Sequence, residues 1–209
     1  EKDLVLSVAK RLRQALESTG HYRVQLTRES DVFIPLRERV AMARSARADL
    51  FLSLHADSND ARSIRGASVY TLSEDGSDRE AAKLAEKENM SDVIAGVDLS
   101  GENSPVASIL IDLAQRDTMN RSVHLAETLL ASLPKATAVR PNPPHRAAGF
   151  AVLKAPDVPA VLVELGYLTN GADEAEMTTD SWRIRVAEAL RAAIDSHFTA
   201  EVRGAISQP

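Results

Sequence analysis

Apolar residues recur every three or four positions along several stretches of the chain, and this spacing predicts helices. The first runs from Leu4 to Leu16 and stops before Gly20. Pro35 can open a second helix, because the first turn does not need the N–H that proline lacks. Further helices are expected after the polar loop 73–78, from about Ile109 to Leu130, and near residues 181–198.

Five shorter runs predict strands. Residues 22–26 alternate between apolar and polar positions, as on a half-buried strand. The other four runs are short and mostly apolar: Leu50–Leu54, Ser68–Leu72, Phe150–Leu153 and Ala160–Val163. Strands that are separated by helical segments indicate an α/β fold with parallel strand pairs.

Residues 80–110 contain more helix and polar loop than a connection between two strands requires, so we interpret them as a helical insertion on the α/β core. We expect one domain, long enough to be a catalytic domain, at residues 1–199, and a frayed tail at residues 200–209. No repeat and no run of about 18 apolar residues is present in the sequence, which excludes a solenoid and a membrane-spanning helix.

The amino-acid composition excludes several classes of function. The 209 residues include no cysteine, which excludes disulfides, thiolate zinc sites and cysteine nucleophiles. Only 4% of the residues are aromatic, and the net charge is −5 without a basic tract. A nucleic-acid partner is therefore not expected, because such partners require basic surfaces or stacking aromatic residues.

His55 and Glu164 are the strongest candidates for chemistry. Each stands directly after a predicted buried strand, and ligands bind at the carboxyl ends of strands in open α/β sheets. A carboxylate beside a buried strand is costly unless it is paired or binds a metal. A zinc hydrolase would use such groups, with histidine and carboxylate as ligands and a further carboxylate as general base. A structural role for both residues is the alternative.

Other catalytic patterns are weak. The sequence has no nucleophile elbow, phosphate-binding loop, dinucleotide fingerprint or compact zinc motif. His21 and His124 are interpreted as surface or structural residues, whereas the loop that carries His145 could reach the cleft expected at the carboxyl ends of the strands. His197 stands near the end of the last predicted helix, where it would complement the helix dipole.

Several ordered strings together resemble the zinc-dependent N-acetylmuramoyl-L-alanine amidases of the Amidase_3 type. They extend over nearly the whole chain, and the long insertion resembles the cell-division amidases of Gram-negative bacteria. The strings are Glu1-Lys2-Asp3, Leu26-Thr27-Arg28, Leu36-Arg37-Glu38-Arg39, Phe51–Asp57, Gly66–Tyr70, Phe150–Pro156 and Pro159–Asn170.

The resemblance implies a mixed, mainly parallel sheet that is flanked by helices, and one Zn²⁺ ion held by two histidines and one glutamate. It implies hydrolysis of the amide between the lactyl group of N-acetylmuramic acid and L-alanine of the stem peptide. By motif, Glu1 and His55 match zinc ligands, and Glu164 matches the catalytic base. The family's first histidine precedes the Glu-Lys-Asp motif, so we expect it on a strand upstream of Glu1.

Related division amidases carry a helix that occludes the cleft and places a glutamate on the zinc. Glu88 is the best match for this inhibitory ligand, and Glu86 is the second choice. The resemblance further implies a periplasmic monomer that acts on peptidoglycan in cell-wall remodelling and daughter-cell separation, with a LytM-domain activator protein. A different zinc hydrolase (a peptidase or a deacetylase) and a non-catalytic wall-binding module remain alternatives.

Overall fold

The computed structural model describes residues 1–96, 108–141 and 143–206. In this part of the chain, four strands form one sheet in the order β1-β4-β2-β3. The strands are β1 (Phe51–His55), β2 (Ser68–Leu72), β3 (His145–Ala148) and β4 (Ala160–Glu164). β1 pairs with β4 and β2 pairs with β3 in parallel, whereas β2 and β4 are antiparallel. The predicted mixed, mainly parallel sheet is confirmed.

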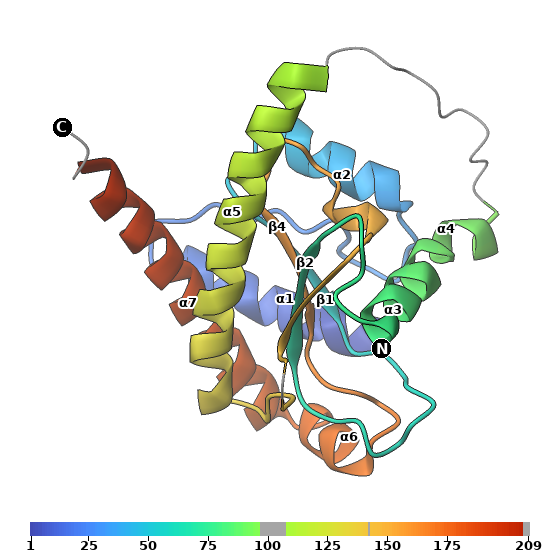
Figure 1. Cartoon of the computed structure of the whole chain (residues 1–209). Helices are drawn as coiled ribbons and strands as arrows, with labels where there is room; N and C mark the ends of the chain where they lie inside the picture. Colours follow the sequence, from blue (N-terminus) through green and yellow to red (C-terminus); the bar gives the residue numbers. More distant parts are fainter. Residues whose placement is uncertain (97–107, 142, 207–209) are drawn as a thin grey trace.

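Helices cover both faces of the sheet (Figure 1). One face packs against α1 (Lys2–Glu17), α5 (Ser108–Ser132) and α7 (Asp180–Ile206), which share a core with β1, β2 and β4. The other face packs against α2 (Leu36–Ser45), α3 (Arg79–Asn89) and the short 3₁₀ helix η2 (Ala151–Leu153). The remaining helices are α4 (Ser91–Ile94), η1 (Leu133–Lys135) and α6 (Gly171–Met177).

The local sequence explains where these helices begin. Helix α2 begins directly after Pro35, as predicted, and the Asp78 carboxylate caps α3 by accepting hydrogen bonds from the N–H groups of Glu80 and Ala81, both at 3.0 Å. Val8, Leu12 and Leu16 face the core from one side of α1. The same spacing that predicted these helices therefore also orients them on the sheet.

Two predicted strands are wrong. Residues 22–26 form no strand in the described structure; Tyr22 and Val24 pack against the core without a neighbouring strand, so their alternation reflects one-sided burial. Phe150–Leu153 contains η2 instead of a strand, because a short apolar run signals burial and does not distinguish strand from helix. The actual strand in this region is β3, whose sequence His-Arg-Ala-Ala has no apolar run.

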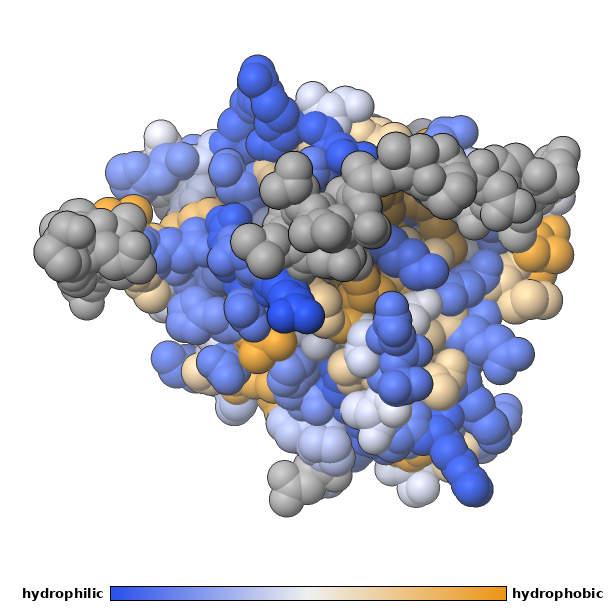
Figure 2. All heavy atoms as spheres, turned by 45° about the horizontal axis from the view of Figure 1, so that its top comes forward, coloured by the Kyte–Doolittle hydropathy of each residue, from blue (hydrophilic) through white to orange (hydrophobic). Residues whose placement is uncertain are grey.

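The C-terminal prediction also needs correction. The last helix continues to Ile206, past residue 199, where we expected a frayed tail to begin; residues 207–209 lie outside the described part. None of the described helices is both long enough and apolar enough to span a membrane. The face in Figure 2 is mainly hydrophilic, and its apolar residues form small separate patches.

Candidate active site

The pairing of β1 with β4 brings the two strongest candidates together. His55 and Glu164 end these parallel strands and are direct partners in the register. His55 is 8% exposed and Glu164 is completely buried. One carboxylate oxygen of Glu164, Oε2, accepts a hydrogen bond from the N–H of Asp57 at 3.1 Å, whereas Oε1 is buried without a partner among the described residues. An unpaired buried oxygen is costly, which favours a functional role for Glu164.

Two further carboxylates face His55. Glu1, at the start of α1, and Glu88, on α3, each place an oxygen 3.2 Å from His55 Nδ1. The other ring nitrogen, Nε2, lies 3.1 Å from Ser53 Oγ. Nδ1 is buried and has no hydrogen-bond partner within the described part of the chain. When the Nε2 proton is donated to Ser53, Nδ1 therefore presents its lone pair toward the two carboxylates.

Burial and mutual repulsion perturb the titration of this cluster. Burial raises the pKa of Glu164 to about 8, although His55 acts against this shift. Burial alone would lower the pKa of His55, but the close contact with the Glu1 carboxylate and the charge of Glu164 outweigh it and raise the pKa to about 9. Burial also raises the pKa of Glu88. The excess of carboxylates around one histidine favours a bound cation.

The donors that are present suit zinc but form only part of a ligand set. Ligand atoms of a tetrahedral zinc lie roughly 3.3 Å apart, given zinc–ligand bonds of about 2.0–2.2 Å. Both carboxylate oxygens lie 3.2 Å from Nδ1, close to that spacing. Across residues 1–96, 108–141 and 143–206, however, no group of three or more His, Asp or Glu side chains is arranged as a complete metal site. A full set needs a further ligand.

Three side chains fix α3 and α4 over this cluster. Lys87 Nζ lies 2.5 Å from Asp57 Oδ1. The Asn89 amide accepts from the N–H of Ala151 and donates to the carbonyl of Gly149, both at 2.8 Å. On α4, the Asp92 carboxylate accepts from the N–H of Leu36 at 2.9 Å. These contacts explain why Glu88 reaches His55.

Of the two glutamates considered for the inhibitory position, Glu88 faces His55 and Glu86 is exposed to solvent. Helices α3 and α4 and the first residues of α5 occupy the described part of the predicted insertion at 80–110; its residues 97–107 lie outside the described structure.

Sequence reasoning missed Ser53, Asp57 and Lys87 as members of the site. Ser53 was accessible to prediction, because residues two apart on a strand share a face and Ser53 precedes His55 by two. Asp57 belongs to the same motif as His55, but its backbone contact with Glu164 depends on the pairing of β1 with β4. The contact of Lys87 depends on the packing of α3.

The other histidines lie elsewhere. His21 is exposed, and His145 belongs to β3, where its Nε2 lies 3.0 Å from Thr71 Oγ1. His197 is completely buried inside α7, next to the ring of His124, so it does not end the helix as expected.

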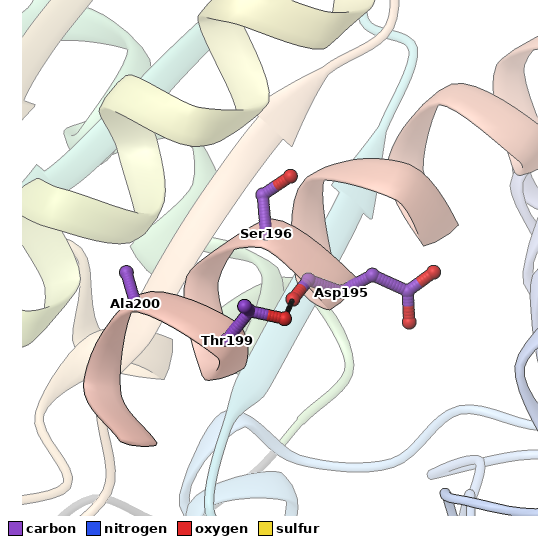
Figure 3. Close-up of a pocket in the computed structure, with 4 residues that line it drawn as sticks. All are labelled: Asp195, Ser196, Thr199 and Ala200. Carbon is purple, nitrogen blue, oxygen red and sulfur yellow. Dashed lines mark hydrogen bonds between the residues drawn. The ribbon is translucent and has the colours of Figure 1, made fainter. Parts of the chain in front are cut away.

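A shallow hollow away from this cluster lies on α7 alone and is lined by Asp195, Ser196, Thr199 and Ala200 (Figure 3). The Thr199 hydroxyl donates to the Asp195 carbonyl of its own helix at 2.7 Å. Asp195 is the titratable residue of this lining, and its carboxylate already accepts hydrogen bonds from Tyr22 and Arg191, so we assign no chemistry to the hollow.

Comparison with known proteins identifies the family. The family model described as N-acetylmuramoyl-L-alanine amidase matches residues 1–196. The chain belongs to the N-acetylmuramoyl-L-alanine amidase family. It is 42% identical over 199 residues to the amidase AmiC of Escherichia coli O6:H1, a match that covers 95% of this chain and 47% of that protein. It is 38% identical over 199 residues to AmiA of Escherichia coli K12, with coverage of 95% and 68%.

The chain thus spans about half the length of the AmiC relative and two thirds of AmiA. Solved structures of amidases share the fold. The amidase Ami1 from Mycobacterium smegmatis matches with a TM-score of 0.69 at 21% identity, over 96% of this chain and 77% of that one. The catalytic domain of CwlV from Bacillus (Paenibacillus) polymyxa matches with a TM-score of 0.62 at 22% identity, over 95% and 85%.

Proposed function

We propose that this chain is the catalytic part of a zinc-dependent peptidoglycan amidase. The substrate is the amide bond between the lactyl group of N-acetylmuramic acid and L-alanine of the stem peptide. One observation carries the proposal: His55 Nδ1 faces two carboxylates while the buried, unpartnered Oε1 of Glu164 lies on the adjacent strand. Family membership supports the substrate class.

Glu1 and His55 would hold the zinc ion, together with a ligand outside the described residues. Bound zinc would supply Lewis-acid chemistry, polarising the scissile carbonyl and lowering the pKa of water toward roughly 7. The Ser53 hydroxyl keeps His55 in the orientation that directs Nδ1 to the site.

Glu164 would act as the general base. Its Oε1 accepts a proton from the attacking water, and the O–H then donates that proton to the departing amine of L-alanine. The Asp57 N–H, bonded to Oε2, holds the carboxyl group in place during both transfers. The products are the lactyl carboxylate on the glycan and a free amino terminus on the peptide.

Removal of metal tests the zinc requirement. Dialysis of the complete protein against a chelator is expected to abolish release of stem peptide from purified muropeptides, because the proposed reaction relies on bound zinc to polarise the scissile carbonyl. Addition of one equivalent of Zn²⁺ should restore release, whereas Mg²⁺ should not, since imidazole and this small donor set suit zinc. Undiminished release from protein shown by elemental analysis to be metal-free would contradict the proposal.

The proposal includes autoinhibition by Glu88. Its carboxylate stands beside the proposed ligands, where it would take the coordination position that the reacting water needs. A LytM-domain activator would relieve the block only if it binds the state in which α3 has moved away more tightly than the closed state. We further propose that the protein is a periplasmic monomer that acts in cell-wall remodelling and daughter-cell separation.

Replacing Glu88 by alanine is expected to raise the basal activity of the complete protein without an activator. A hydrogen bond or contact with a charged group is worth about 1.5–3 kcal/mol, so its loss should shift the balance toward the open state roughly 10- to 100-fold. The measurement is the initial rate of peptide release from sacculi. Glu86→Ala is the matched control, since it removes the same charge from an exposed position on the same helix.

Basal activity that stays flat in Glu88→Ala, with zinc content and thermal stability unchanged, would eliminate the inhibitory role. Equal activation by Glu86→Ala would instead indicate a general effect of charge on α3.

A further inference from the structure

Arg39 provides a positive charge at the candidate active site. It lies on α2 and lines the same cavity of about 890 Å³ as Glu1, His55 and Glu88. Its Nε donates a hydrogen bond to the carbonyl of Ile34 at 2.8 Å. Its guanidinium carbon lies 5.8 Å from the centre of the Phe33 ring. These contacts hold the guanidinium in one place at the cavity.

The two terminal nitrogens of Arg39 remain available. Among residues 1–96, 108–141 and 143–206, neither has a hydrogen bond or an ion pair. The carboxylates that act electrostatically on Arg39 have other partners: Asp92 accepts from the N–H of Leu36, and Glu1 and Glu88 face His55. The structure therefore directs an open guanidinium fork to the same cavity as the reacting groups.

Partial burial strengthens the attraction of Arg39 for an anion, against the opposing charges of Asp92, Glu88 and Glu1. The side chain is partly buried, and burial lowers its pKa while Asp92 and Glu88 act against that shift. Arginine nevertheless stays charged in proteins. A planar, charged fork in a partly desolvated cavity matches a carboxylate, which it can bind through two parallel hydrogen bonds.

We propose that Arg39 binds a free carboxylate on the peptide side of the scissile amide. This inference rests on the proposed amidase function and names a determinant of its specificity. The glycan side offers no such anion, because the lactyl carboxyl group of N-acetylmuramic acid is itself part of the scissile amide. A carboxylate on the stem peptide is thus the anionic group of the substrate that can reach Arg39. The exposed Phe33 ring provides an apolar wall beside it.

The test compares two soluble muropeptides that differ only in the stem peptide, whose free carboxyl groups are carboxylates in one and carboxamides in the other. With the complete protein, Arg39→Gln is expected to lower kcat/KM for the carboxylate substrate about 10- to 100-fold, chiefly through KM. The same variant should change kcat/KM for the carboxamide substrate by less than about threefold. Arg39→Lys should lie between, since it keeps the charge and loses the fork.

Arg44→Gln is the matched control. Arg44 lies on the same helix but pairs with Asp157 through two hydrogen bonds at 2.8 and 3.2 Å, so neither substrate should be affected by its loss. An equal loss on both substrates in Arg39→Gln would reveal a merely structural role and overturn the inference, as would no loss on either. Failure of the unaltered protein to cleave both substrates would instead refute the proposed function.

Discussion

Glu164→Gln is expected to abolish most turnover while the protein keeps its fold and its zinc. General-base catalysis contributes about 10²–10⁴-fold to a rate, and glutamine cannot accept the proton from the attacking water. The substitution is nearly isosteric, and its amide oxygen can still accept the hydrogen bond from Asp57. Burial already disfavours the charged form of Glu164, since its pKa is raised to about 8, so a neutral residue should not destabilise the site.

The measurement is kcat for peptide release from a purified muropeptide, with zinc content by elemental analysis and thermal unfolding as controls. A Glu164→Gln variant that binds zinc and releases peptide at the unaltered rate would remove Glu164 from the role of base. Glu80→Gln provides a comparison. Glu80 lies on the N-terminal turn of α3, pairs with Arg140 and takes no part in the proposed chemistry.

His55→Ala is expected to lose both metal and activity. His55 Nδ1 is the nitrogen that both neighbouring carboxylates face, so its removal takes away the donor around which the site is arranged. Loss of a residue that merely supports a ligand lowers metal affinity about 10- to 100-fold, and loss of the ligand itself should exceed this. Titration with Zn²⁺ against a competing chelator measures the change.

The loss of zinc affinity in Ser53→Ala provides a reference for that in His55→Ala. Ser53 contacts Nε2 of His55 without reaching the proposed metal position. Its loss should weaken zinc binding about 10- to 100-fold, and the activity at saturating zinc should stay unchanged. Zinc affinity in His55→Ala that equals that of the unaltered protein would show that His55 is not a ligand.

The sequence predicted the site residues that stand at the carboxyl ends of buried strands. His55 and Glu164 each come directly after a buried run, and parallel pairing places such ends at one edge of a sheet. The roles of Glu1 and Glu88 came from resemblance alone, because no local pattern distinguishes them from solvated helix residues. Arg39 was not predicted at all, since its place at the cavity depends on how α2 packs against the sheet.

The errors in the fold have a common physical origin. Alternation and apolar runs report which residues are buried, whereas a strand also requires a neighbouring backbone to bond with. Tyr22 and Val24 are packed against the core, and residues 151–153 are largely buried, yet none of them belongs to the sheet. The helices were predicted more accurately, because their backbone hydrogen bonds are local and need no distant partner.

We infer that the cluster around His55 and Glu164 hydrolyses the amide between N-acetylmuramic acid and L-alanine. Mass spectrometry of the products from purified sacculi tests it most directly, with the complete zinc-loaded protein and its Glu164→Gln variant side by side. We expect intact stem peptides with free L-alanine amino termini, and glycan strands that carry free lactyl carboxyl groups, from the unaltered protein only. Cleavage within the peptide, or loss of acetyl groups from an otherwise intact polymer, would contradict it.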